Sequence, residues 1–158
     1  MTKKNNNLIS PYGGKLVDLL VTKEEREELL AKSSRLPNVQ ISSRSLCDLE
    51  LLATGAFSPL DRFMRKADYE RVLTEMRLSD GTLFPIPITL PVDEKALPSW
   101  GEQITLSDAR NNPLAVMQIE EVFHYDPQHP PQRFRRSPEK LVTAGEGVQE
   151  RRPHIHLA

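Results

Sequence analysis

The sequence predicts an α+β fold, a small, partly closed β-barrel with flanking helices, followed by a disordered tail. Short segments of strand character alternate with segments whose apolar residues recur every three or four positions. The longest strand candidate, residues 114–123, has apolar side chains on both faces, as a barrel or a covered sheet requires. After residue 126 this pattern ends, and the proline-rich remainder buries too little apolar surface to offset its ordering entropy.

Composition excludes several classes of protein. The 158 residues suit one domain with an appendage, and a net charge of −1 gives no global attraction to nucleic acid or an anionic membrane. Residues 1–7 are polar, and no segment approaches the roughly 20 apolar residues that span a bilayer. The one cysteine, Cys47, excludes an internal disulfide and is predicted to be a buried, inert thiol. A disordered N-terminus, a cytoplasmic location and no membrane partner are predicted.

The first third of the chain contains a turn, a helix and a short strand. Pro11 to Gly14 is predicted as a turn, since paired glycines tolerate positive φ. Residues 22–33 are predicted as a surface helix, capped by Thr22 with Glu25 completing a capping box. Residues 39–41 form a short strand.

Residues 42–64 are the predicted centre of the fold. A helix begins at one of three candidate serine caps, Ser42, Ser43 or Ser45. It places four apolar side chains on one face, namely Leu46, Leu49, Leu52 and Ala53. Gly55 supplies the left-handed residue that ends this helix. The turn that follows is too apolar for an exposed loop, and its large side chains are predicted to fill the core, namely Phe57, Pro59, Leu60, Phe63 and Met64.

The second half is predicted to be mostly extended. A helix over 67–76 comes first, with one apolar face made of Tyr69, Val72, Leu73 and Met76. Asp80-Gly81 predicts a turn, and residues 83–92 an extended segment whose prolines require an edge strand or an irregular start. Residues 104–106 form a strand, and residues 110–113 a turn into the long strand.

Five segments occur in the order found in one enzyme family. Ser43 to Leu52 and Gly55 to Met64 resemble the N-terminal, PUA-like domain of ATP sulfurylase (sulfate adenylyltransferase). Three further segments agree, which are PYGGKLVDL from Pro11, DGTLFPIPITL from Asp80 and LSDARNNPLA from Leu106. One departure is Tyr12, which stands where many members have histidine. The resemblance implies a PUA-like domain over residues 8–126 and an atypical tail over 127–158.

The resemblance also implies what this chain does not do. The family joins ATP and sulfate to give adenylyl sulfate and pyrophosphate, and its catalytic residues lie in a second, C-terminal domain. That domain's motifs, Gln-x-Arg-Asn-Pro, His-x-x-His and Gly-Arg-Asp, do not occur in this sequence. We therefore expect a non-catalytic domain, inactive alone, with no catalytic, substrate-binding or metal-binding residue and no cofactor.

Two segments imitate catalytic motifs without matching them. Ala109 to Pro113 contains Arg, Asn and Pro, but it has an extra Asn and lacks the Gln, so a turn is favoured. His154 and His156 are one residue too close, and only His124 and His129 are further histidines for a metal site. No glycine pair opens a phosphate-binding loop.

The candidate functional surface is an interdomain contact. Its candidate residues come from the start of the central helix and the turn after it, namely Arg44, Phe57, Ser58, Asp61 and Arg62. The alternative is that they only pack the domain's own interior. The implied partner is the catalytic domain of ATP sulfurylase, or further copies in a homo-oligomer.

Two other functions remain open. Arg133, Arg135 and Arg136 around Phe134 could serve a small RNA-binding PUA-like module, although four tail carboxylates dilute that charge and nucleic acid is not expected. The chain could also complement a separately encoded catalytic domain. Because resemblance and hydrophobic pattern both stop near residue 127, we hypothesise a truncated product with an out-of-frame or replaced tail.

Overall fold

The computed structural model describes residues 8–93, 101–124 and 140–144, the last for its backbone only. Three α-helices, one 3-10 turn and five strands occur in these ranges, and they confirm the predicted α+β class. In chain order they are η1 (Tyr12–Gly14), α1 (Lys23–Ser33), β1 (Asn38–Gln40), α2 (Ser43–Ala53), α3 (Lys66–Glu75), β2 (Leu90–Val92), β3 (Gln103–Ser107), β4 (Pro113–His124) and β5 (Lys140–Ala144). The predicted disordered N-terminus, 1–7, lies outside them.

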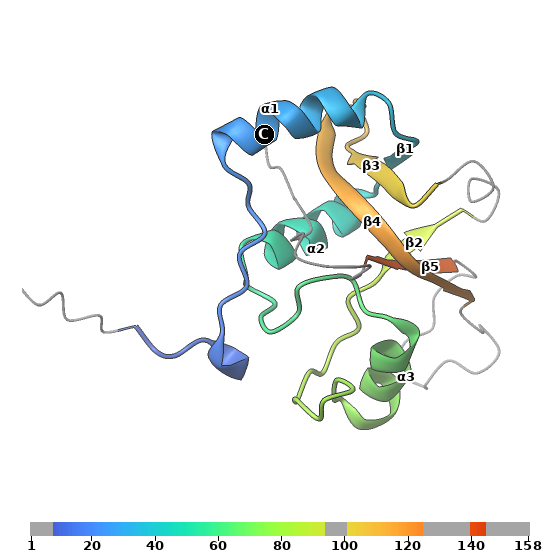
Figure 1. The fold of residues 1–158 in the computed structure, drawn as a ribbon. Coiled ribbons are helices and arrows are strands. Elements are labelled where there is room, and N and C mark those ends of the chain that lie inside the picture. Colours follow the sequence, from blue (N-terminus) through green and yellow to red (C-terminus); the bar gives the residue numbers. More distant parts are fainter. Residues whose placement is uncertain (1–7, 94–100, 125–139, 145–158) are drawn as a thin grey trace, which may run out of the picture.

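Strand β4 organises the sheet, whose strand order is β1-β3-β4-β5-β2. Its first half pairs antiparallel with β3 and its second half with β5, while β1 runs parallel to β3. Figure 1 shows β4 crossing the molecule, with α1 and α2 beside one end and α3 near the other. In the described residues β1 and β2 are the two edges, so the barrel is open between them. Only Leu90–Val92 of the predicted extended segment is a strand, and it is an edge strand as its prolines required.

Helices α1 and α2 begin at the predicted caps. The Thr22 hydroxyl accepts the Glu25 amide at 3.3 Å, and the Glu25 carboxylate accepts the Thr22 amide at 2.8 Å, which completes the capping box. Ser42 caps α2 by accepting the amide of Ser45 at 3.1 Å. These bonds satisfy amides that have no partner within the helix.

The core lies between α2, the turn after it and the sheet. Leu49, Leu52 and Ala53 are buried on one face of α2. Phe63 and Met64 are buried next to them, which confirms that large side chains of the following turn fill the core. Four successive residues of β4 are buried, namely Leu114, Ala115, Val116 and Met117. Because successive side chains point to opposite faces, both faces of the strand are covered here, as predicted from the sequence.

Two predicted core residues are instead at the surface. Cys47 is exposed, so the prediction of a buried thiol is wrong. Each helical residue turns about 100°, so Cys47 points away from Leu49, two positions on. Met76 is also exposed, because α3 ends at Glu75 and Met76 adopts the left-handed conformation (φ 57°).

Strand β5 has no counterpart in the sequence prediction, which assigned residues 127–158 to a tail. Lys140–Ala144 pairs with both β4 and β2 and links them into one sheet. Five residues are too few to produce a period that stands out in a proline-rich segment. The remaining tail features, including Arg133 to Arg136, His129, His154 and His156, lie outside the described residues. In the described part, no helix is long and apolar enough to cross a membrane.

Candidate interface

The five residues predicted to meet a partner differ in exposure and in the contacts they make within the domain. Arg44 is exposed on the first turn of α2 and lies beside Asp48 one turn later. Burial raises the pKa of Asp48, and the charge of Arg44 opposes that shift. Phe57 is half-buried and meets Phe84 edge to face, with ring centroids 6.3 Å apart.

Ser58 is buried and acts within the domain. Its hydroxyl accepts the amide of Val17 at 3.0 Å and donates to the carbonyl of Gly55 at 2.6 Å. The first bond ties the N-terminal segment to the turn after α2, and the second lies within that turn. Because both hydrogen-bonding roles are taken inside the domain, we do not propose Ser58 as an interface residue.

Asp61 and Arg62 belong to a network of four charged side chains. Arg62 donates two hydrogen bonds to the carboxylate of Asp61, at 2.6 and 3.0 Å, and reaches Glu120 at 3.3 Å. Arg65 donates to the other oxygen of Glu120 at 2.6 Å. The Arg62 and Glu120 side chains are only 15% and 11% exposed, so solvent weakens their attraction less than at a free surface.

An irregularity in the pairing of β4 with β5 places Glu120 in this network. The register between β4 and β5 shifts between Ile119 and Glu121, so Glu120 is the extra residue of a β-bulge. A bulge bends the strand locally, increases its twist and redirects a side chain. Sequence reasoning missed Glu120 and Arg65. The available signal was the pair Glu120-Glu121, which interrupts the apolar run of the long strand, because a partly buried carboxylate there needs a basic partner.

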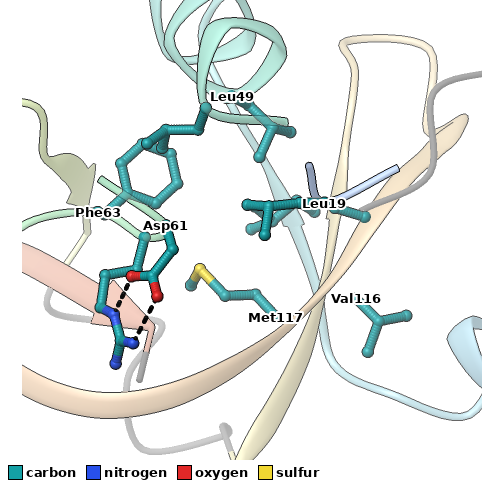
Figure 2. A pocket seen from close by; sticks show the side chains of 10 residues that line it. Leu19, Leu49, Asp61, Phe63, Val116 and Met117 are labelled. Carbon is teal, nitrogen blue, oxygen red and sulfur yellow. Dashed lines mark hydrogen bonds and ion pairs between the residues drawn. The ribbon is translucent and has the colours of Figure 1, made fainter. Parts of the chain in front are cut away.

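A small apolar pocket lies beside the network (Figure 2). Leu19, Leu49, Phe63 and Met117 point towards one space, and Asp61 lies at its edge with its carboxylate turned to a guanidinium group. The volume is about 20 Å³, which is room for about one water molecule. This pocket is too small for a nucleotide. Among the described residues, no cluster of three potential metal ligands occurs.

The ionisation of Asp61 should contribute to stability in a pH-dependent way. Burial opposes its charge, but the hydrogen bonds and charge of Arg62 outweigh burial and lower the pKa of Asp61. A lowered pKa stabilises the fold above the unfolded-state value, 3.8, and this contribution is lost as pH falls further. We expect Asp61→Asn to lower the melting temperature at pH 7, and by progressively less as the pH falls below 3.8. In an Arg62→Met background most of that difference should vanish at pH 7. A loss of melting temperature that changes neither with pH nor with the Arg62 substitution would contradict the role given to the Asp61 charge.

Comparison with known proteins agrees with this fold. The profile of the PUA-like domain family matches residues 9–140. This chain belongs to the PUA-like domain family. The match ends at residue 140, the first residue of β5. It therefore extends past residue 126, the predicted C-terminal boundary of the domain.

The relatives of this PUA-like domain are longer proteins. It is 44% identical over 124 residues to a sulfate adenylyltransferase of Nostoc punctiforme, covering 77% of this chain and 32% of that one. Identity to the sulfate adenylyltransferase of Persephonella marina is 40% over 121 residues, covering 75% and 31%. For that of Yarrowia lipolytica it is 37% over 158 residues, covering 89% and 28%. The chain thus spans about a third of their length, and the resemblance predicted from the sequence is confirmed.

A solved structure has the same fold. A chain of a hexameric APS kinase from Thiobacillus denitrificans matches with a TM-score of 0.71 and 34% identity. The match covers 87% of this chain and 26% of the other. The PUA-like domain therefore occurs there, too, as one part of a larger chain.

Proposed function

We propose that this chain is the non-catalytic N-terminal domain of a sulfate adenylyltransferase, the enzyme class that makes adenylyl sulfate and pyrophosphate from ATP and sulfate. The observation that carries the proposal is a sequence identity of 37–44% to sulfate adenylyltransferases over only 28–32% of their length. Its contribution is a folded surface that packs against the rest of the enzyme. A cytoplasmic setting, predicted from the single cysteine, fits this role.

The chemistry of the described residues supports a structural role. Sulfate and nucleotide phosphates need arginines or backbone amides free to bind them. Arg62 and Arg65 are instead paired with Asp61 and Glu120 inside the domain. Arg62 is the basic side chain that lines the apolar pocket, and its pairing with Asp61 and Glu120 opposes a role in stabilising a transferred phosphoryl group.

Assembly into a larger particle is part of the proposal. The Thiobacillus denitrificans chain of the same fold comes from a hexamer. We propose that this domain, too, meets further domains of its own enzyme, and that copies of the whole enzyme associate. The mass of the assembled enzyme in solution tests this.

A hybrid enzyme tests the proposed function. Residues 8–144 of this chain replace the matched portion of the Nostoc punctiforme sulfate adenylyltransferase, and sulfate-dependent pyrophosphate release from ATP is measured. We expect turnover by the hybrid and none by this chain alone. Turnover by the chain alone would overturn the proposal.

RNA binding is the competing outcome. An RNA-binding module should retain single-stranded RNA at about 150 mM salt, and its affinity should fall steeply as salt rises. We expect no retention, because the net charge is −1 and the described arginines of the network are paired with carboxylates. Retention with a steep salt dependence would favour the RNA-binding alternative.

A further inference from the structure

One side of the domain exposes a group of large apolar side chains. In the part of the chain that the structure describes, eleven large apolar residues are exposed, and five of these lie between Leu8 and Leu20. We define the apolar face by seven of the eleven, which are 39–93% exposed, namely Leu8, Ile9, Tyr12, Leu16, Leu51, Leu83 and Ile86. Monomeric proteins rarely expose contiguous apolar patches larger than a few hundred Å².

Contacts between three segments bring this face together. The Tyr12 hydroxyl donates to the Leu83 carbonyl at 2.8 Å, which ties the N-terminal segment to the loop before β2. Gly13 lies against Pro59 in the turn after α2. Figure 1 shows the blue N-terminal segment passing the end of α2 and this turn.

Helix α2 contributes Leu51 to the same face. Gly55 lies beyond the end of α2 at Ala53, and the amide of Phe57 in the following turn donates to the carbonyl of Leu51 at 3.3 Å, so Leu51 adjoins this turn. A methyl group built on Gly55 would lie 2.9 Å from Cδ1 of Leu16, so Leu16 packs directly against this end. The N-terminal segment thus bridges α2 and the loop that carries Leu83 and Ile86.

Apart from α2, where Glu50 adjoins Leu51, the segments that meet at the apolar face are almost free of charge. Residues 55–60 and 83–92 contain no charged side chain, and residues 8–20 contain only Lys15 and Asp18, whereas 27% of the whole chain is charged. Depletion of charge together with exposed aromatic and aliphatic groups is typical of the centre of a protein interface. The charged network of Arg62 and Glu120 lies outside these segments.

We propose that the apolar face docks the folded part of the sulfate adenylyltransferase that lies outside the match with this chain, through an uncharged, mainly apolar counter-surface. This inference rests on the proposed function. In the Nostoc punctiforme relative, 68% of the length (100 − 32) lies outside the match and must pack somewhere. The face differs from the mixed set predicted from sequence, of which Phe57 meets Phe84 of the 83–92 segment and Ser58 bonds to Val17 beside Leu16.

A tethered domain is a better occupant than a second copy of this chain. A stable dimer of separate chains typically buries about 800 Å² on each partner. A domain in the same polypeptide binds at a high effective concentration, so a smaller apolar face stays covered. A face of seven partly exposed side chains therefore suits a domain of the same polypeptide.

Hydroxyl-radical footprinting measures side-chain exposure directly and tests the inference. The oxidation rates of Tyr12, Leu16 and Ile86 are compared between this chain alone and the hybrid with the Nostoc punctiforme enzyme. We expect severalfold slower oxidation of all three in the hybrid. Leu30, exposed on α1, serves as the control and should react equally in both.

Paired variants provide the second readout. Leu16→Asp/Ile86→Asp charges the face, and Leu30→Asp/Val122→Asp makes the same change at exposed apolar positions elsewhere. We expect the first pair to lower the melting temperature of the hybrid more than that of this chain alone. The control pair should lower both equally.

The outcomes separate this inference from the proposed function. An active hybrid in which the face is oxidised as fast as in the chain alone would overturn the docking surface and leave the function standing. An inactive, folded hybrid would contradict the function, whatever the footprint. A dimer of this chain that dissociates with Leu16→Asp/Ile86→Asp would make a second copy the occupant and overturn the inference.

Discussion

Replacing Gly55 by alanine should destabilise the domain by about 3–4 kcal/mol, through backbone strain and lost hydrogen bonds. Gly55 has φ 79°, and the left-handed region alone costs alanine about 1–2 kcal/mol. The new Cβ would also overlap the carbonyl oxygen of Val17, which belongs to the backbone and cannot rotate away. The N-terminal segment would have to shift, which weakens the bonds from Val17 to Ser58 and from Leu19 to Ala53.

Gly81 provides a matched control for that variant. Its φ is 91°, but nothing lies within 4 Å of an added Cβ. Gly81→Ala should therefore cost only the conformational term, about 1–2 kcal/mol. Urea unfolding followed by circular dichroism gives both free energies. Equal losses in the two variants would show that Gly55 does not determine how the N-terminal segment packs.

Removing the charge of Glu120 should have the second largest effect, about 2 kcal/mol in Glu120→Gln, because a buried ion pair loses one partner. Arg65 would lose the carboxylate it contacts at 2.6 Å, and Arg62 would lose its contact with Glu120 while keeping that with Asp61. The loss stays below that of a fully buried pair, since the Arg65 side chain is 43% exposed.

An exposed ion pair is the control for Glu120. Lys66 and Glu70 lie 3.8 Å apart on α3 with both side chains more than half exposed. Glu70→Gln should change the free energy of unfolding by less than about 0.5 kcal/mol. A double-mutant cycle of Glu120→Gln with Arg65→Gln should give a favourable coupling energy. The absence of coupling would assign the Glu120 effect to local packing.

Local sequence rules predicted the elements near α2 well. The cap at Ser42, the left-handed Gly55 and the buried Phe63 each follow from short-range patterns that need no knowledge of the tertiary fold. The capping box at Thr22 was readable for the same reason.

The proposed docking face was harder to predict, because contacts between distant segments create it. Tyr12 and Leu83 are 71 residues apart, and only the folded backbone brings them together. Glu120 likewise meets Arg62 across 58 residues through a bulge that depends on pairing with β5. Ser58 lies in the most recognisable stretch of the sequence but serves the interior. A recognised motif therefore indicated the fold and not the docking face.

Turnover by the hybrid enzyme is the most direct test of the claim that this chain is a docking domain of a sulfate adenylyltransferase. The claim predicts that residues 8–144, placed on the unmatched part of the Nostoc punctiforme enzyme, support sulfate-dependent pyrophosphate release. The rate should exceed that of the same enzyme lacking its matched portion. A hybrid that is folded by circular dichroism and yet no faster than the shortened enzyme would contradict it.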